Sequence, residues 1–372
     1  MEVYKEIEDL PMEDKQKDYK YKLVEKKIHD IQRLVRDSGR QNYNVLCEGR
    51  EGVFKPVLGL RKKDFKRTQI SASHYGEFIA YKLAEKIGIP ACKVELVLKS
   101  VKLKFSKSGK IVLVPGCISY FDLEKDETFT HAITILNWYK REHYEEYISI
   151  LNNSGNIDLK LETNSDQNNN NIEIVIPALE TYVKERYGAT EQETAKIKQN
   201  IIDMVMYDCR FANTDRNDEN YGLAYNIKNE QYRLYPLFDN EYILGFPEFE
   251  ETITKYNSEG LREHINKNLT SRMGITGNPT KIDYQIMLEY LFTKYPEESK
   301  KSYDKVMKIS ELDLIELMNE CEGLSETHKA YALILFRERR RGFEFKYEEY
   351  FYRKNQFSEM TIKEDDEISL DD

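Results

Sequence analysis

The chain has 372 residues, of which 40% are hydrophobic and 33% charged, and its formal net charge is −10. This length suffices for two lobes with separate cores, and the acidic balance argues against a general binder of nucleic-acid backbones, which carries a basic face. With no long apolar run, no secretory leader and five scattered cysteines, we expect a cytoplasmic protein without membrane contact, direct nucleic-acid contact or a zinc site.

Residues 1–36 are predicted to form an N-terminal helical segment. The apolar residues of its second half follow a rough helical spacing: Val24, Ile28, Ile31, Leu34 and Val35. A turn-forming stretch, 37–42, comes next. Residues 43–47 and 52–57 then read as two strands of a hairpin joined by Glu48-Gly49-Arg50-Glu51.

The remainder of the first third predicts one helix and a second hairpin. Residues 75–87 have an amphipathic pattern that stops at Gly88, as suits a helix C-terminus. Residues 94–105 and 111–121 are rich in β-formers and are separated by a glycine-containing turn. Residues 37–121 are therefore expected to form an N-lobe, a small antiparallel sheet with one helix.

Residues 122–355 are predicted to form a mainly helical C-lobe. An Asn-rich tract, 164–171, is too polar to bury a core and is expected to be a flexible surface loop inside an insertion near 150–175. A non-helical block spans 212–245. A last helix, from about 325 to 352, contains the basic run 337–341, interpreted as a solvated helix face. The acidic tail, 356–372, is expected to be disordered.

The strongest chemical signal is Asn213-Thr214-Asp215-Arg216-Asn217-Asp218-Glu219-Asn220, which lies between a helix and a strand. A second strand leads into Pro236-Leu237-Phe238-Asp239. Phosphoryl transfer requires one carboxylate to orient the attacking hydroxyl and hard oxygen ligands to hold Mg²⁺. A loop followed by a hairpin can bring Asp215, Asn220 and Asp239 to one edge. Asp and Asn also favour turns for local reasons, so a purely structural role stays open.

Lys55, in Val53-Phe54-Lys55-Pro56, is the second candidate. Its ammonium can neutralise ATP phosphates, and Glu77 on the following helix can pair with it, as kinases require. The alternative is an edge-strand lysine that discourages aggregation. A third candidate is the turn 38–42, whose backbone N–H groups can cradle phosphates, although a plain helix-to-strand turn fits the same residues.

Taken together, these segments resemble the HipA-like serine/threonine kinases, especially the compact CtkA-type members, and are more distantly similar to phosphatidylinositol 3/4-kinases. The resemblance covers about 38–121 and 194–245. It rests on four motifs that occur in the family's order: Val53–Pro56, Gly76–Ala80, Asn213–Asn220 and Pro236–Asp239. The resemblance implies an α+β, two-lobed protein-kinase-like fold, with a β-rich N-lobe, a mainly helical C-lobe and ATP between them.

The resemblance also implies a role for each matched residue. Lys55 looks like the phosphate-binding lysine and Asp215 like the catalytic base, while Asn220 and Asp239 look like the Mg²⁺ ligands. Cys117 to Phe121 would be the hinge that meets adenine. The implied ATP-binding residues are Lys55, Glu77, Ser38, Gly39, Arg40, Gln41, Tyr120 and Phe121. Ser38 lies in the family's phosphate loop, where HipA carries an inhibitory autophosphorylated serine.

Two features depart from the family pattern. Asn217 stands where the family usually has a histidine, and its amide can keep a loop hydrogen bond but cannot titrate near neutral pH. The residues before the first hairpin are too few for the extra N-terminal subdomain of full-length HipA, which favours the compact members.

The expected activity is ATP- and Mg²⁺-dependent transfer of the γ-phosphate to a protein hydroxyl, with autophosphorylation. One alternative is a lipid or small-molecule kinase, because the phosphatidylinositol kinases share the catalytic layout. Another is a nucleotide-binding regulator paired with an antitoxin-like partner. The sequence does not name the protein substrate.

Overall fold

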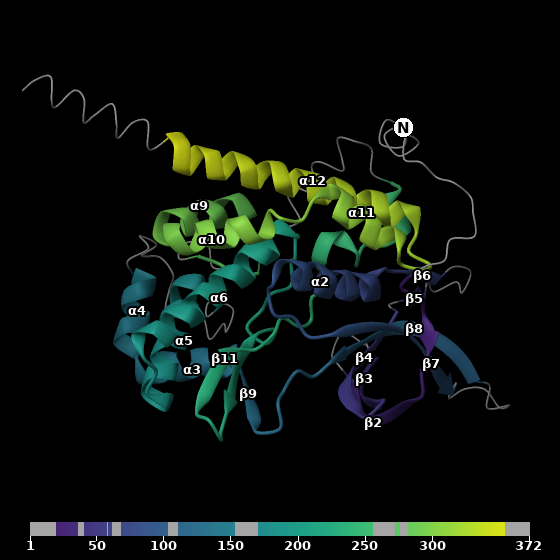
Figure 1. The fold of residues 1–372 in the computed structure, drawn as a ribbon, viewed down its shortest axis with the longest axis horizontal. Coiled ribbons are helices and arrows are strands. Elements are labelled where there is room, and N and C mark those ends of the chain that lie inside the picture. The colour runs from purple at the N-terminus through teal and green to yellow at the C-terminus, as the bar shows by residue number, and fades with distance from the viewer. Residues whose placement is uncertain are drawn as a thin grey trace, which may run out of the picture.

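The computed structural model describes residues 20–35, 41–57, 59–61, 68–102, 111–152, 170–255, 272–275 and 282–353. A β-rich N-lobe and a mainly helical C-lobe can be distinguished in Figure 1, which agrees with the predicted α+β division, and one hydrophobic core cluster includes residues of both. Ser38, Gly39, Arg40 and the acidic tail 356–372 lie outside the described residues.

The N-lobe is built on a six-stranded sheet in the order β1-β7-β8-β4-β3-β2. Its strands are β1 (Val24–Glu25), β2 (Ile28–Val35), β3 (Gln41–Cys47), β4 (Arg50–Pro56), β7 (Val94–Lys102) and β8 (Ile111–Tyr120). The predicted hairpin of β3 and β4 is confirmed. Glu48 and Gly49 form its turn with φ of 51° and 79°, and positive φ at both positions matches the strand twist. Two short strands, β5 (Gly59–Arg61) and β6 (Thr68–Ile70), pair separately.

The predicted N-terminal helix is wrong, because β1 pairs parallel with β7 and β2 pairs antiparallel with β3. β-branched residues favour strands, and the free edges of the sheet supply a hydrogen-bonding partner that overrides a weak helical spacing. A bulge between Asp30 and Gln32 interrupts the two-residue alternation of β2. This interruption explains why apolar residues three positions apart resemble a helical stripe.

Helix α2 (Ser73–Ile87) connects the sheet to the C-lobe and lies between the sheet and α12 (Glu326–Glu348) in Figure 1. The predicted helix is confirmed, and Gly88 ends it in the left-handed conformation with φ 72°. A Cβ atom added at Gly76 would lie only 2.6 Å from the carbonyl oxygen of Glu241. The backbone of α2 therefore approaches the Glu241 segment more closely than any side chain would allow.

The C-lobe combines helices with a small sheet. Its other helical elements are α3 (Ala132–Glu142), α4 (Tyr144–Asn152), α5 (Ile172–Tyr187), α6 (Glu191–Arg210), η2 (Ile243–Gly245), α7 (Glu250–Ile253), α9 (Tyr284–Lys294), α10 (Pro296–Val306), α11 (Glu311–Asn319) and the π-helical turn η3 (Glu349–Arg353). The two strands expected within 212–245 are confirmed as β10 (Gly222–Asn226) and β11 (Gln231–Leu234). A third strand that the sequence did not reveal, β9 (Glu127–His131), pairs with β10.

Two expectations about polar segments need correction. Asn170 and Asn171, at the end of the Asn-rich tract, are only 6% and 1% exposed, because their amides serve buried backbone groups and the start of α5. Residues 153–169 of the predicted insertion lie outside the described residues. Within the basic run, Arg339 is buried with its guanidinium 3.7 Å from the Tyr284 ring centre, so only part of the run is solvated.

Among the helices in the described ranges, none has both the length and the apolar character needed to cross a bilayer.

The contact at Gly76 predicts a stability defect for Gly76→Ala. Overpacking costs about 1–3 kcal/mol, and the better helix propensity of alanine offsets about 0.5–1 kcal/mol of that. We expect urea denaturation to show a free energy of unfolding lowered by about 1–2 kcal/mol. Glu85→Ala, at an exposed position of the same helix, is the control and should stay within about 0.5 kcal/mol of the wild type. Equal stability of the two variants would contradict the close backbone approach.

Candidate active site

Lys55 lies on β4, on the face of the sheet that packs against α2. Its Nζ is 3.0 Å from Oε2 of Glu77 and 2.6 Å from Oδ1 of Asp239. The three side chains are only 5%, 0% and 8% exposed. The predicted pair of Lys55 and Glu77 is thus present, and Asp239 joins it. Because β4 lies between β8 and β3, the edge-strand explanation of Lys55 is wrong.

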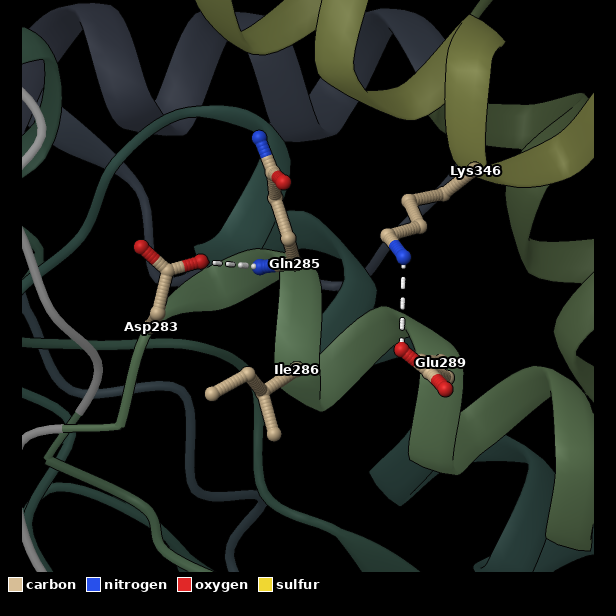
Figure 2. Close-up of a pocket in the computed structure, with 5 residues that line it drawn as sticks. All are labelled: Asp283, Gln285, Ile286, Glu289 and Lys346. Atoms are coloured by element: carbon tan, nitrogen blue, oxygen red, sulfur yellow. Dashed lines mark hydrogen bonds and ion pairs between the residues drawn. The ribbon is translucent and has the colours of Figure 1, made fainter. Parts of the chain in front are cut away.

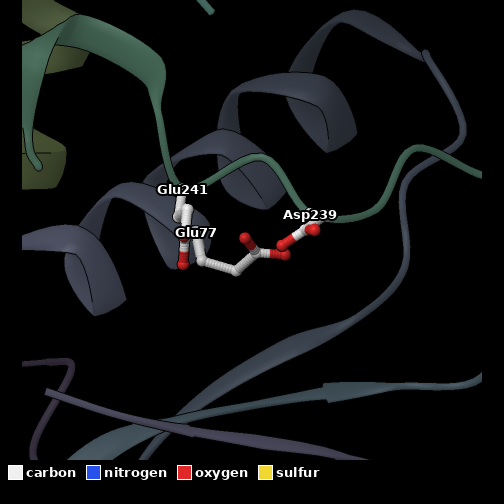
Figure 3. A group of neighbouring side chains, drawn as sticks. All are labelled: Glu77, Asp239 and Glu241. Carbon is white, nitrogen blue, oxygen red and sulfur yellow. The ribbon is translucent and has the colours of Figure 1, made fainter. Parts of the chain in front are cut away.

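Glu241 is a third carboxylate at this cluster, and sequence reasoning missed it. Carboxylate oxygens of Glu77, Asp239 and Glu241 lie within 4.8 Å of one another. Figure 3 shows the Glu77 carboxyl, from α2, pointing toward Asp239, which shares a loop with Glu241. Burial alone would lower the pKa of Lys55, but Asp239, Glu77 and Glu241 raise it. The pKa of the Glu77 carboxyl is raised, and burial is the main cause.

The composition of this cluster suits a divalent cation. Carboxylate oxygens of three side chains lie within 4.8 Å of one another in the protein interior, beside the Lys55 ammonium. Carboxylate and amide oxygens are the hard ligands that Mg²⁺ prefers. Asp239 has a φ of 56°, an uncommon value for a residue other than glycine. Such a backbone is held by surrounding contacts and is typical of functional sites.

The Asp215 loop is ordered by its own amides. The side-chain oxygen of Asn213 accepts the Asp215 N–H at 3.2 Å, and the amide of Asn220 donates to the Asp215 carbonyl at 2.8 Å. Asn217 accepts the Glu219 N–H at 2.9 Å, so it keeps a hydrogen bond within the loop as expected. Burial is the main cause that raises the pKa of Asp215, while Arg272 acts in the opposite direction.

Arg216 is a buried residue beside the site that the sequence motif contains but to which no role was assigned. Its Nε and Nη2 donate to the two carboxylate oxygens of Asp208, at 2.8 and 3.0 Å. Its Nη1 donates to the carbonyls of Asn220 and Phe238, at 2.8 and 3.0 Å, and its Nη2 also donates to the Asn240 side chain. One buried guanidinium therefore joins α6, the Asp215 loop and the Asp239 loop. One sequence feature indicated such a buried partner: an aspartate, Asp208, stands near the end of an otherwise apolar helical stretch.

The expected hinge residues lie at the end of β8. The Tyr120 side chain is buried beside Phe54, on the sheet face opposite Lys55, and its hydroxyl donates to Glu95 at 2.8 Å. The Tyr120 side chain therefore lies away from Lys55, and its predicted contact with ATP stays a prediction that only the backbone could fulfil. Phe121 is exposed, and its N–H donates to the Glu51 carbonyl at 3.0 Å. Gln41 opens β3, but the rest of the predicted phosphate loop lies outside the described residues except Asn42.

Two hollows in the described part of the C-lobe lie apart from these residues. One, of about 410 Å³, is lined by Asp283, Gln285, Ile286, Glu289 and Lys346 (Figure 2). The other, of about 290 Å³, lies beside β10, β11 and α6. An ion pair between Lys346 and Glu289, 3.2 Å apart, borders the first hollow. Neither hollow is lined by Lys55, Asp215 or Asp239, so we place the chemistry at the buried cluster.

Comparison with solved structures identifies the fold. The chain superposes on the crystal structure of the Helicobacter pylori proinflammatory kinase CtkA with a TM-score of 0.57 at 14% identity, covering 84% of this chain and 94% of that one. HipA in the Shewanella oneidensis MR-1 HipA–HipB–operator DNA complex gives a TM-score of 0.43 at 12% identity, over 92% and 70% of the two chains. No protein-family model and no curated protein matches the sequence. The likeness to CtkA confirms the expected two-lobed, kinase-like fold, and at this identity it shows the fold alone.

The buried Arg216 contacts predict a large loss of stability for Arg216→Ala. The substitution leaves Asp208 buried without its cationic partner, and breaking a buried ion pair in this way costs about 3–5 kcal/mol. Arg141→Ala is the matched control, because Arg141 pairs with Glu142 on the surface, where such pairs contribute only about 0–1 kcal/mol. Denaturation in urea would measure the free energy of unfolding of both variants. A loss for Arg216→Ala no larger than for Arg141→Ala would refute the role of Arg216 as a buried connector.

Proposed function

We propose that the chain is an ATP- and Mg²⁺-dependent kinase that transfers the γ-phosphate of ATP to a serine or threonine hydroxyl of a protein. The observation that carries the proposal is the buried ion pair of Lys55 and Glu77, on a central strand and a facing helix, with Asp239 on the same ammonium. Kinases use a lysine held by a helix glutamate in this way to bind ATP phosphates. The kinase-like fold supports the same activity.

In the proposed reaction, the acceptor hydroxyl oxygen forms a bond to the γ-phosphorus. The bond from that phosphorus to the β,γ-bridging oxygen breaks, and its electron pair leaves with ADP. Asp215 orients the hydroxyl and receives its proton, a role that suits a carboxylate whose pKa is raised by burial. Lys55 binds the phosphates, and Glu77 fixes the position of its ammonium.

Asn220 and Asp239 are the residues we assign to Mg²⁺. Arg216 donates to the carbonyls of Asn220 and Phe238, so the backbones that carry the two ligands are held together. When bound, Mg²⁺ would neutralise the negative charge that develops on the phosphates during transfer. Glu241 lies close enough to add negative charge to the same region.

The grouped carboxylates predict a strict requirement for a divalent cation. ADP formation and phosphate transfer should both be lost in excess EDTA and restored by added Mg²⁺, because the carboxylates alone would repel ATP. A coupled assay for ADP, combined with mass spectrometry of phosphosites, measures both. Equal transfer with and without EDTA would show that the assignment of Asn220 and Asp239 is wrong.

Asp215 and Lys55 should differ in what they contribute. Asp215→Asn should lower transfer by about 10²–10⁴-fold with near-normal ATP binding, because Asp215 acts on the acceptor in the transition state. Lys55→Ala should weaken ATP binding as well as transfer, because its charge contacts the phosphates in both states. Calorimetric titration of ATP beside the transfer assay separates the two effects.

The surface pair of Asp126 and Lys228 supplies the controls. Its members are 3.1 Å apart on the C-lobe surface. Asp126→Asn and Lys228→Ala should retain wild-type ATP binding and transfer. Wild-type transfer by Asp215→Asn would return the Asp215 loop to a purely structural role.

A further inference from the structure

Arg272 lies directly against the proposed catalytic base. Its Nη1 is 2.9 Å from Oδ1 of Asp215, and the Arg272 side chain is 54% exposed while that of Asp215 is 18% exposed. Oδ1 of Asp215 is buried and accepts no hydrogen bond among the described residues, so its contact with Arg272 is an ion pair without hydrogen-bond alignment. The accessible surface of the carboxylate side chain therefore belongs to its other atoms, among them Oδ2. Arg272 thus covers one carboxylate oxygen without enclosing the whole group.

The backbone of Arg272 is held by the last residues of the Asn-rich tract. The buried amide of Asn170 donates to the carbonyls of Arg216 and Arg272, at 2.8 and 3.2 Å, and its oxygen accepts the Tyr221 hydroxyl at 2.9 Å. The Gly274 N–H donates to the Asn170 carbonyl at 2.9 Å. One side chain therefore connects the Asp215 loop to the segment 272–275, although 46 and 102 residues separate Asn170 from Arg216 and Arg272.

We propose that Arg272 is a further catalytic residue, which orients Asp215 through Oδ1 and binds the transferred phosphoryl group, and that Asn170 positions it. The inference rests on the proposed kinase function. A guanidinium has five N–H donors in a rigid fork, so one ion pair with Asp215 leaves donors for phosphate oxygens. Arg216 cannot take this role, because it is buried and its donors serve Asp208, Asn220, Phe238 and Asn240.

A position beside the base suits this task chemically. During transfer, negative charge spreads over the oxygens of the moving phosphoryl group, and the acceptor hydroxyl must lie between that group and Asp215. A cation fixed next to Asp215 is therefore near the charge that develops. The exposure of the Arg272 side chain leaves it accessible from solvent, as an acceptor-side contact requires.

The test compares Arg272→Ala and Arg272→Lys with wild type, using ATP, Mg²⁺ and myelin basic protein as the acceptor probe. We expect Arg272→Ala to lower kcat for transfer by about 10²–10³-fold, the usual effect of losing one donor to transition-state charge. ATP affinity by calorimetry should change less than about 3-fold, because the contact is made mainly in the transition state. Arg272→Lys should recover part of the rate, and added guanidinium should partly rescue Arg272→Ala. Neither recovery is expected of a merely structural residue.

Asn170→Ala tests the positioning role. It should lower kcat in the same direction as Arg272→Ala, and the double variant should lose much less than the product of the two effects, because both changes disable one arrangement. Arg341→Ala, which removes a surface arginine paired with Glu338, should leave kcat unchanged.

Three outcomes would overturn the inference. Unchanged kcat in Arg272→Ala would show that the ion pair has no part in transfer, and increased kcat would show that Arg272 blocks the base. Absence of both ADP formation and phosphate transfer with the wild-type protein would instead refute the proposed function itself, and the role of Arg272 with it. The wild-type measurement therefore distinguishes failure of the function from failure of the Arg272 assignment.

Discussion

The guanidinium of Arg216 is the interaction on which the candidate site depends. It carries a full charge in the protein interior, where charge is tolerated only with close partners. Asp208 supplies the opposite charge from α6, and the carbonyls of Asn220 and Phe238 and the side chain of Asn240 accept the remaining donors. Because these partners come from different elements, satisfying one side chain fixes the Asp215 loop and the Asp239 loop relative to α6.

The cluster around Lys55 differs from the Arg216 cluster in its charged groups. There Glu77, Asp239 and Glu241 bring carboxylate oxygens within 4.8 Å of one another beside the Lys55 ammonium. Arg216 thus holds the two loops in place, whereas the Lys55 cluster groups oxygen ligands that suit a cation. The left-handed backbone of Asp239 is consistent with this division, because the strain at that residue is held by contacts to its neighbours, Phe238 and Asn240.

Much of this arrangement could be predicted from local patterns. The hairpin at Glu48-Gly49 and the helix that ends at Gly88 have short-range signals, and both are confirmed. The pairing of Lys55 with Glu77 was also expected. The strands β1 and β2 could not be predicted, because their stability comes from pairing with β7 and β3 across the sheet. The contacts of Glu241 and Arg272 were equally hidden, since each joins segments distant in sequence and depends on the completed fold.

Asn170 shows why polar composition is an insufficient guide to order. An Asn-rich tract cannot bury apolar surface, which favours a loop. A single amide, however, can donate twice and accept, so it satisfies several buried backbone groups where chain segments meet. The Asp215 loop and the segment 272–275 meet at such a place, and buried carbonyls there require donors. The composition of the tract disfavours a helix or strand, while the hydrogen-bonding capacity of its last residues makes them suited to connect two loops beside the proposed catalytic base.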